Sequence, residues 1–281
     1  MFEAFIETII DSLKLLPFLF ITYLVMELIE NKAGDKTNAI IKKSGKFGPI
    51  LGALLGLIPQ CGFSAAAASL YAGRIITLGS LIAIFLSTSD EMLPILISEA
   101  APINVIIKIL LIKFLIGMVA GLLIDLFFRK IYKKKEESNH IHQICNDEHC
   151  HCNENGILKS SIKHTLHIFA YIFVISLIIN ILIFIIGEDN ISNIIINIPI
   201  LGNIISTIVG LIPNCASSVI LTQLYLEEII PLGCLISGLL VNSGIGLLIL
   251  FKVNKPKKQN LMILLILFII GLFSGIVIDL I

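Results

Sequence analysis

The sequence LIPQCG at residues 57–62 recurs as LIPNCA at residues 211–216, and this recurrence constrains the fold more than any other feature. Each copy interrupts an apolar segment with a proline, Pro59 or Pro213, and then places an amide side chain and a thiol. The prolines are 154 residues apart (213 − 59), and so are the two cysteines (215 − 61). Because a proline breaks a helix in its interior, both copies predict a helix break. We expect the two breaks to form the centre of one site.

The residues that follow the first break repeat at the same offset in the second half. Gly117 and Gly121 correspond to Gly271 and Gly275, and the match needs no gap. This GxxxG spacing lets helices approach each other closely. The match indicates an internal duplication. The chain accordingly divides into a first transmembrane repeat, a polar linker and a second transmembrane repeat, at residues 1–128, 129–163 and 164–281.

Composition places the chain in a membrane. Of its 281 residues, 57% are hydrophobic and only 14% are charged, whereas a soluble domain carries about 25% charged residues. The mean hydropathy is +0.99. These values indicate a polytopic membrane protein whose partner is the lipid bilayer. The net charge is zero, so the sequence shows no nucleic-acid footprint. The first apolar run follows acidic residues, so we expect a retained helix and no cleaved signal peptide.

Each repeat is expected to hold five helical segments, in an all-α fold of two inverted-topology repeats. Segments 48–73 and 198–226 are split by the prolines into halves of about 10 residues, or roughly 15 Å of helix, which is half a bilayer core. Each is either a re-entrant hairpin or a pair of short spans. Full spans are expected at 12–30, 75–97, 104–128, 164–186 and 229–251, with a last span at the C-terminus.

Basic residues gather in three stretches, 31–47, 129–135 and 252–258. We expect the protein in the plasma membrane. The positive-inside rule then puts these basic stretches, and the linker with them, in the cytoplasm. Both ends of the chain then lie outside the cytoplasm, and the repeats have opposite orientations. Such symmetry brings the two breaks together near the midplane, where broken backbone requires buried protein or a watery cavity. Rocking one repeat against the other would give alternating access.

Several short sequences resemble the family of ten-span heavy-metal exporters, whose members are assigned to manganese or to arsenic efflux. The resemblance covers nearly the whole chain and includes the His/Cys-bearing linker. It implies ten spans and metal export, and the direction of transport comes from it alone. The sequences that carry the resemblance are GLIPQCG at 56–62, YAGR at 71–74, LSTSDE at 86–91 and GLIPNC at 210–215.

Asp90 and Glu91 interrupt the span at 75–97, and a carboxylate at that depth usually marks a transport pathway. Their repeat partners are Gly244 and Ile245, so the site would be asymmetric, with neutral oxygens beside one acid. Alternatively, Asp90 lies near the outer interface or pairs with Arg74. The expected pathway residues are Gln60, Cys61, Ser64, Ser87, Thr88, Ser89, Asp90, Glu91, Asn214, Cys215, Ser218, Asn242 and Ser243, with helix breaks at Pro59, Gly62 and Pro213.

The linker is dense in metal ligands but lacks the paired CxxC spacing of a structural zinc site. We expect a flexible cytoplasmic arm that senses or delivers a transition metal, with its cysteines reduced. The alternative is a solvated linker that binds metal only incidentally. Its candidate ligands are His140, His142, Cys145, His149, Cys150, His151 and Cys152.

Ligand chemistry favours a hard divalent ion. Asp90 with amide and hydroxyl oxygens suits manganese, whereas the thiols of Cys61 and Cys215 suit arsenite or zinc, or pack as buried cysteines do. We therefore expect a secondary-active exporter of a divalent transition metal such as manganese, with the ion as substrate, no required cofactor and no enzyme activity. Three alternatives stay open: an arsenite or organoarsenical efflux permease, a passive metal channel and a thiol-redox membrane enzyme. The nucleotide-binding motif GxxxxGK[ST] is absent from the sequence, so an ion gradient or a partner would drive transport. The protein could also form a homo-oligomer.

Overall fold

The computed structural model describes residues 47–59, 61–89, 91–132 and 199–281, with scattered positions in 16–24 and 162–181. Every element in these residues is a helix, and no strand occurs among them. The all-α class expected from the sequence is therefore confirmed. Most of the spans expected at 12–30 and 164–186 lie outside the described residues.

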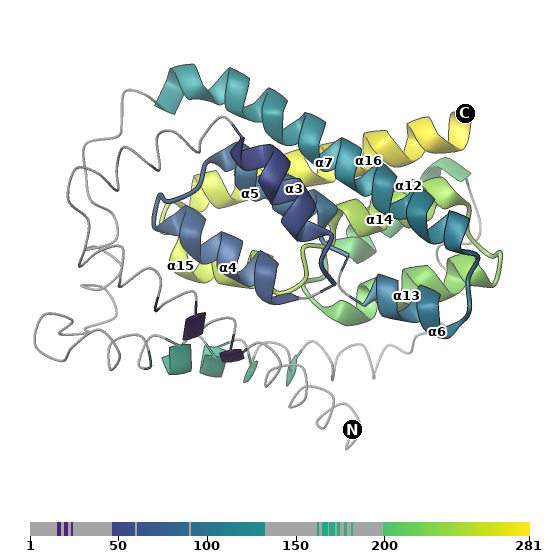
Figure 1. Ribbon diagram of the computed structural model, residues 1–281, viewed down its shortest axis with the longest axis horizontal. Coiled ribbons are helices and arrows are strands. Elements are labelled where there is room, and N and C mark those ends of the chain that lie inside the picture. The colour runs from purple at the N-terminus through teal and green to yellow at the C-terminus, as the bar shows by residue number, and fades with distance from the viewer. Residues whose placement is uncertain are drawn as a thin grey trace, which may run out of the picture.

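Two sets of five helices make up the described fold (Figure 1). The first set is α3 (Gly48–Gly56), α4 (Cys61–Ala72), α5 (Leu78–Ser87), α6 (Met92–Ser98) and α7 (Ile103–Tyr132). The second set is α12 (Pro199–Gly210), α13 (Cys215–Leu226), α14 (Leu232–Val241), α15 (Gly246–Val253) and α16 (Lys257–Leu280). Helices α4 and α13 both begin at the cysteine of the repeated motif, so the expected split of the two proline-containing segments is confirmed.

Among the described residues, four stretches are long and apolar enough to cross a membrane, and they are Leu78–Ser98, Ile103–Phe127, Leu232–Val253 and Lys257–Leu280. Two of them correspond to the spans expected at 75–97 and 229–251. They differ from expectation because each is interrupted by a helix break that lies outside the repeated proline motif. The first break separates α5 from α6, and the other separates α14 from α15. Polar residues occupy both breaks, and Gly244 has a φ of 53°, a conformation that only glycine adopts readily.

Helices α5 and α14 form the centre of the bundle, since all residues of α5 and nearly all of α14 are buried. Helices α7 and α16 lie against them and leave one apolar face uncovered, with side chains such as Leu115 and Ile269 exposed. Hydrophobic side chains on the outside of a spanning helix are what lipid contact requires.

Glycines set how closely these helices pack. A Cβ atom on Gly121 of α7 would lie 2.6 Å from the carbonyl oxygen of Gly79 in α5. A Cβ atom on Gly275 of α16 would lie 2.5 Å from the carbonyl oxygen of Gly233 in α14. The close approach predicted from the GxxxG spacing is therefore confirmed in both halves.

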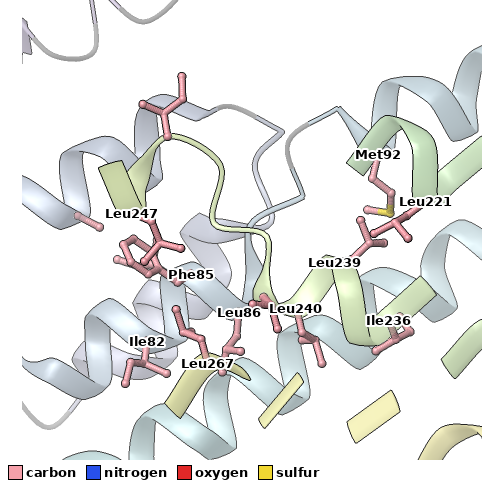
Figure 2. Close-up of a cluster of buried hydrophobic side chains, with 14 of the residues drawn as sticks. Ile82, Phe85, Leu86, Met92, Leu221, Ile236, Leu239, Leu240, Leu247 and Leu267 are labelled. Carbon is pink, nitrogen blue, oxygen red and sulfur yellow. The ribbon is translucent and has the colours of Figure 1, made fainter. Parts of the chain in front are cut away.

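The two halves share one core. Helix α4 packs against α15, and α13 packs against α6, so each half contributes to both of these pairs. Figure 2 shows Phe85 of α5 beside Leu247 of α15, and Met92 of α6 beside Leu221 of α13. The arrangement buries the breaks after α5 and α14 in the interior of a single bundle.

Candidate transport site at the helix breaks

The break after α5 uses its own hydroxyl groups to finish the helix. The Oγ of Ser87 donates to the carbonyl oxygen of Ala83 (2.7 Å), and the Oγ1 of Thr88 donates to that of Ile84 (2.7 Å). Such bonds to the preceding turn satisfy the hydroxyl proton locally. Both side chains are buried. Ser87, one of these two predicted pathway residues, therefore belongs to α5 and forms its hydroxyl hydrogen bond within that helix.

Ser89 joins this break to the first proline break. Its Oγ donates a 2.7 Å hydrogen bond to the carbonyl oxygen of Leu57, which follows the end of α3. Helix α3 approaches α5 closely there, because a Cβ atom on Gly56 would lie 2.7 Å from the carbonyl oxygen of Ile84. The structure thus brings together two breaks that are 32 residues apart in the sequence.

The break after α14 holds two predicted pathway residues with unsatisfied polar atoms. The Oδ1 of Asn242 accepts a 2.9 Å hydrogen bond from the amide of Gly244. Within the described part of the chain, the Nδ2 of Asn242 and the Oγ of Ser243 are buried and have no hydrogen-bond partner. A buried polar atom left without a partner costs about 1–3 kcal/mol. Groups of this kind mark a place where water, an ion or a substrate binds.

The first turn of α4 lies next to that same break. A Cβ atom on Gly246, the first residue of α15, would lie 2.8 Å from Cβ of Ser64 and 2.9 Å from Cε1 of Phe85. Ser64 is itself fully buried. The proline break of the first half therefore begins a helix that reaches the polar break of the second half.

Lys113 is a buried charged residue at the breaks that was not predicted from the sequence. It lies on α7, is fully buried, and its Nζ donates to the carbonyl oxygens of Thr88 and, at 3.0 Å, Leu239. It thus connects the break of the first half with the end of α14 in the second. The signal that could have found it is the second of two lysines in the apolar run at 104–128, because Lys113 lies in the middle of that run whereas Lys108 lies near its start. A charge buried in a membrane span is costly and usually functional.

The other predicted pathway residues in the described ranges lie at the starts of helices or take part in helix hydrogen bonds. Asn214 is the buried N-cap residue of α13, and the carbonyl of buried Ser218 accepts a bond from Thr222. Glu91 is the half-buried N-cap residue of α6. Of the predicted break residues, Gly62 is buried, Pro213 is half-buried and Pro59 is exposed.

Some predictions fall outside the described residues. Gln60 and Asp90 lie there, as do the side chains of Cys61 and Cys215 and the whole of the linker from His140 to Cys152. Among the residues that are described, no group of three or more His, Cys, Asp or Glu side chains could hold a metal ion.

The comparisons with known proteins agree with a membrane protein. A family model described as "Putative, 10TM heavy-metal exporter" matches residues 1–183 and 131–255. The chain belongs to this family. The resemblance that the short sequences carried is therefore confirmed. No curated protein and no solved structure gives a significant match. Membership of the heavy-metal exporter family identifies the chain as a multi-pass membrane protein, as the four apolar spans in its described part also indicate.

The described groups of this exporter are mainly oxygen atoms. The site offers the hydroxyl of Ser243 and the carbonyl oxygens at the ends of α5 and α14, and the Oδ1 of Asn242 beside them already accepts from Gly244. Hydroxyl, amide and carbonyl oxygens suit hard divalent cations better than soft metals. Helix ends that terminate inside a membrane protein also coordinate cations through their last carbonyls.

Proposed function

We propose that this protein is a secondary-active transporter that exports a divalent transition-metal ion such as manganese. The observation that carries this proposal is the buried hydroxyl oxygen of Ser243, which has no partner among the described residues and lies at a break within an apolar span. An unsatisfied hydroxyl inside a membrane requires a polar occupant. The oxygen atoms around it, and Asp90 in the same segment as Thr88, favour a hard cation.

Two inverted repeats would supply this transporter with its symmetry. Several local structures recur at an offset of 154 residues, and they support the proposal. Arg74 and Glu228 (228 − 74 = 154) each lie two residues after the end of a helix, α4 or α13, and have φ angles of 61° and 59°. In Figure 1, α4 lies beside α15 toward one end of the bundle, and α13 lies beside α6 toward the other. We infer that the α3–α4 and α12–α13 pairs are re-entrant hairpins entering from opposite sides of the membrane.

Alternating access would then open and close the two helix pairs in turn. At the α4–α15 end, the Nε2 of Gln259 donates to the hydroxyl of Tyr71 (2.5 Å), and Arg74 donates to the Oε1 of Gln259 (3.3 Å). These bonds join the first half to the start of α16. Because they cross between the halves, they would separate when one repeat rocks against the other.

The orientation follows from the basic loops. With those loops in the cytoplasm, the α4–α15 end faces inward and the termini lie outside the plasma membrane. The linker between the halves would then be a cytoplasmic arm that senses or delivers the metal through its histidines and cysteines. The protein would need no cofactor, and the metal ion would be its substrate.

Reconstituted transport tests the proposal. Purified full-length protein in proteoliposomes should move Mn²⁺, and Mn²⁺ on the far side should stimulate exchange. A passive channel would show no such counterflow. Ser243→Ala should lower the rate because its hydroxyl has no partner among the described residues, whereas the control Ser87→Ala should not, because that hydroxyl is bonded within its own helix.

Growth of a deletion strain identifies the substrate. We expect sensitivity to manganese with raised cell manganese, and ordinary growth on zinc, cobalt, arsenite and methylarsenite. Sensitivity confined to an arsenical would favour the alternative of an arsenite or organoarsenical permease. Equal growth on all five, with no transport in liposomes, would contradict metal export.

A further inference from the structure

Lys113 joins the two halves of the bundle at their helix breaks. Its side chain is fully buried, and its ammonium donates to the carbonyl oxygens of Thr88 and Leu239, the latter at 3.0 Å. Thr88 is the C-cap residue of α5, and Leu239 lies in the last turn of α14, which ends at Val241. One cation therefore bridges the carboxyl ends of two broken helices from opposite halves.

The carbonyl groups of Thr88 and Leu239 can bind a cation because both lie at the carboxyl ends of helices. The last four carbonyls of a helix have no amide partner within that helix. The amide that would bond Leu239 belongs to Ser243, which lies beyond the end of α14. Carbonyls at helix ends carry a partial negative charge, and in broken transporter helices they coordinate ions. Lys113 fills such a site with its own ammonium.

The second half shows that packing does not require a lysine here. Leu267 of α16 occupies the corresponding position (267 − 113 = 154) and is also fully buried. The helix contacts beside the two positions match, because Cβ atoms on Gly117 and Gly271 would each lie 2.9 Å from a carbonyl oxygen, of Ala83 and Ser237 respectively. A leucine therefore satisfies the same geometry, and the lysine adds a charge that is expensive inside a membrane.

We propose that the Lys113 ammonium is a built-in competitor for the transported cation. In the metal-free protein it occupies the carbonyl oxygens of Thr88 and Leu239. An arriving metal ion binds these oxygens, with the hydroxyl of Ser243 from the same break as Leu239, and displaces the ammonium. When the metal leaves, the ammonium returns, so binding stays weak enough for release. This proposal rests on the proposed function.

Equilibrium binding of Mn²⁺ to the detergent-purified full chain tests the competition. Lys113→Leu, which copies Leu267, should bind Mn²⁺ about tenfold more tightly than wild type, within the usual range of coupling between two sites. It should also transport more slowly, because release becomes difficult. Lys113→Arg keeps the charge and should bind nearly as wild type does. Lys108→Leu is the matched control, since it removes an exposed lysine from the same helix without touching a break.

A second measurement applies even if Lys113→Leu does not fold. Mn²⁺ should increase the labelling of Lys113 in the wild-type protein by an amine-reactive reagent, measured by mass spectrometry. Unchanged Mn²⁺ affinity in Lys113→Leu, or labelling of Lys113 that Mn²⁺ does not increase, would overturn the competitor role while wild-type transport upholds the proposed function. A wild-type protein that neither binds nor transports Mn²⁺ would overturn both.

Discussion

The backbone amide of Gly79 donates a 2.8 Å hydrogen bond to the Oδ1 of Asp125. In the second half, the amide of Gly233 donates a 2.7 Å bond to the Oδ1 of Asp279 (279 − 125 = 154). Each carboxylate lies near the end of an outer helix and accepts from the first turn of a broken central helix. A negative charge is favourable at that end of a helix, where amides are otherwise unpaired. These two contacts fasten the outer helices α7 and α16 to the centre of the bundle.

Asparagine at Asp125 should weaken this attachment. Asp125 also accepts a 2.6 Å bond from the hydroxyl of Thr77, so the substitution removes charge from two hydrogen bonds. Bonds to charged groups contribute about 1.5–3 kcal/mol. We expect Asp125→Asn to lower the free energy of unfolding in detergent by about 2 kcal/mol, and Asp279→Asn to act similarly. Glu99→Gln, which changes an exposed carboxylate, should leave it unchanged. If Asp125→Asn unfolds like wild type, the contact is not structural.

An added methyl group at Gly121 should separate α7 from α5. Its Cβ would lie 2.6 Å from the carbonyl oxygen of Gly79 and 2.8 Å from Cβ of Ala83, and a backbone oxygen cannot turn aside. Overpacking of this kind costs about 1–3 kcal/mol. Gly121→Ala should therefore lower the yield and melting temperature of the folded protein, and Gly275→Ala should do the same. Val119→Ala, on the exposed face of α7, is the control. Equal melting of Gly121→Ala and wild type would refute the close packing.

The duplicated motif and the glycine spacing were readable in the sequence because each is a local pattern with one physical meaning. A proline after an apolar run ends a helix, and α3 and α12 end just before Pro59 and Pro213. The breaks at Thr88 and Asn242 were not predicted as breaks. An apolar stretch of 21 residues averages to a single span even where its middle leaves the helical conformation. Only the tertiary contacts of those residues show that the helix stops.

Lys113 escaped prediction for a related reason. A lysine in an apolar run can reach the membrane surface along its own flexible stem, so the sequence does not say whether it is buried. Its two carbonyl partners lie 25 and 126 residues away and become available only because α5 and α14 end where they do. The position of this charge therefore depends on the breaks that the sequence concealed.

Serine at both Cys61 and Cys215 tests what the repeated thiols do. If the substrate is a hard ion held by oxygens, the double substitution should leave Mn²⁺ transport within about threefold of wild type, because manganese has little preference for thiolates. Loss of arsenite efflux with Mn²⁺ transport intact would assign the thiols to a soft metal. A thiol-redox enzyme would lose its activity completely, so intact transport by the double variant would exclude that class.

Asparagine at Asp90 tests the acid expected in the pathway. Asp90 follows Ser89, whose hydroxyl bonds Leu57 at the first break, and precedes the N-cap residue of α6. A carboxylate is the strongest oxygen ligand that this segment offers a divalent cation, so Asp90→Asn should reduce Mn²⁺ transport at least tenfold while the protein still folds. The measurement is Mn²⁺ uptake into proteoliposomes at matched protein content. Glu99→Gln is the control, because it removes a carboxylate from an exposed position outside the breaks and should transport normally. Normal transport by Asp90→Asn would mean that the cation is held by neutral oxygens alone, and the case for a hard divalent substrate would then depend on the hydroxyl of Ser243 and the carbonyl oxygens at the helix ends.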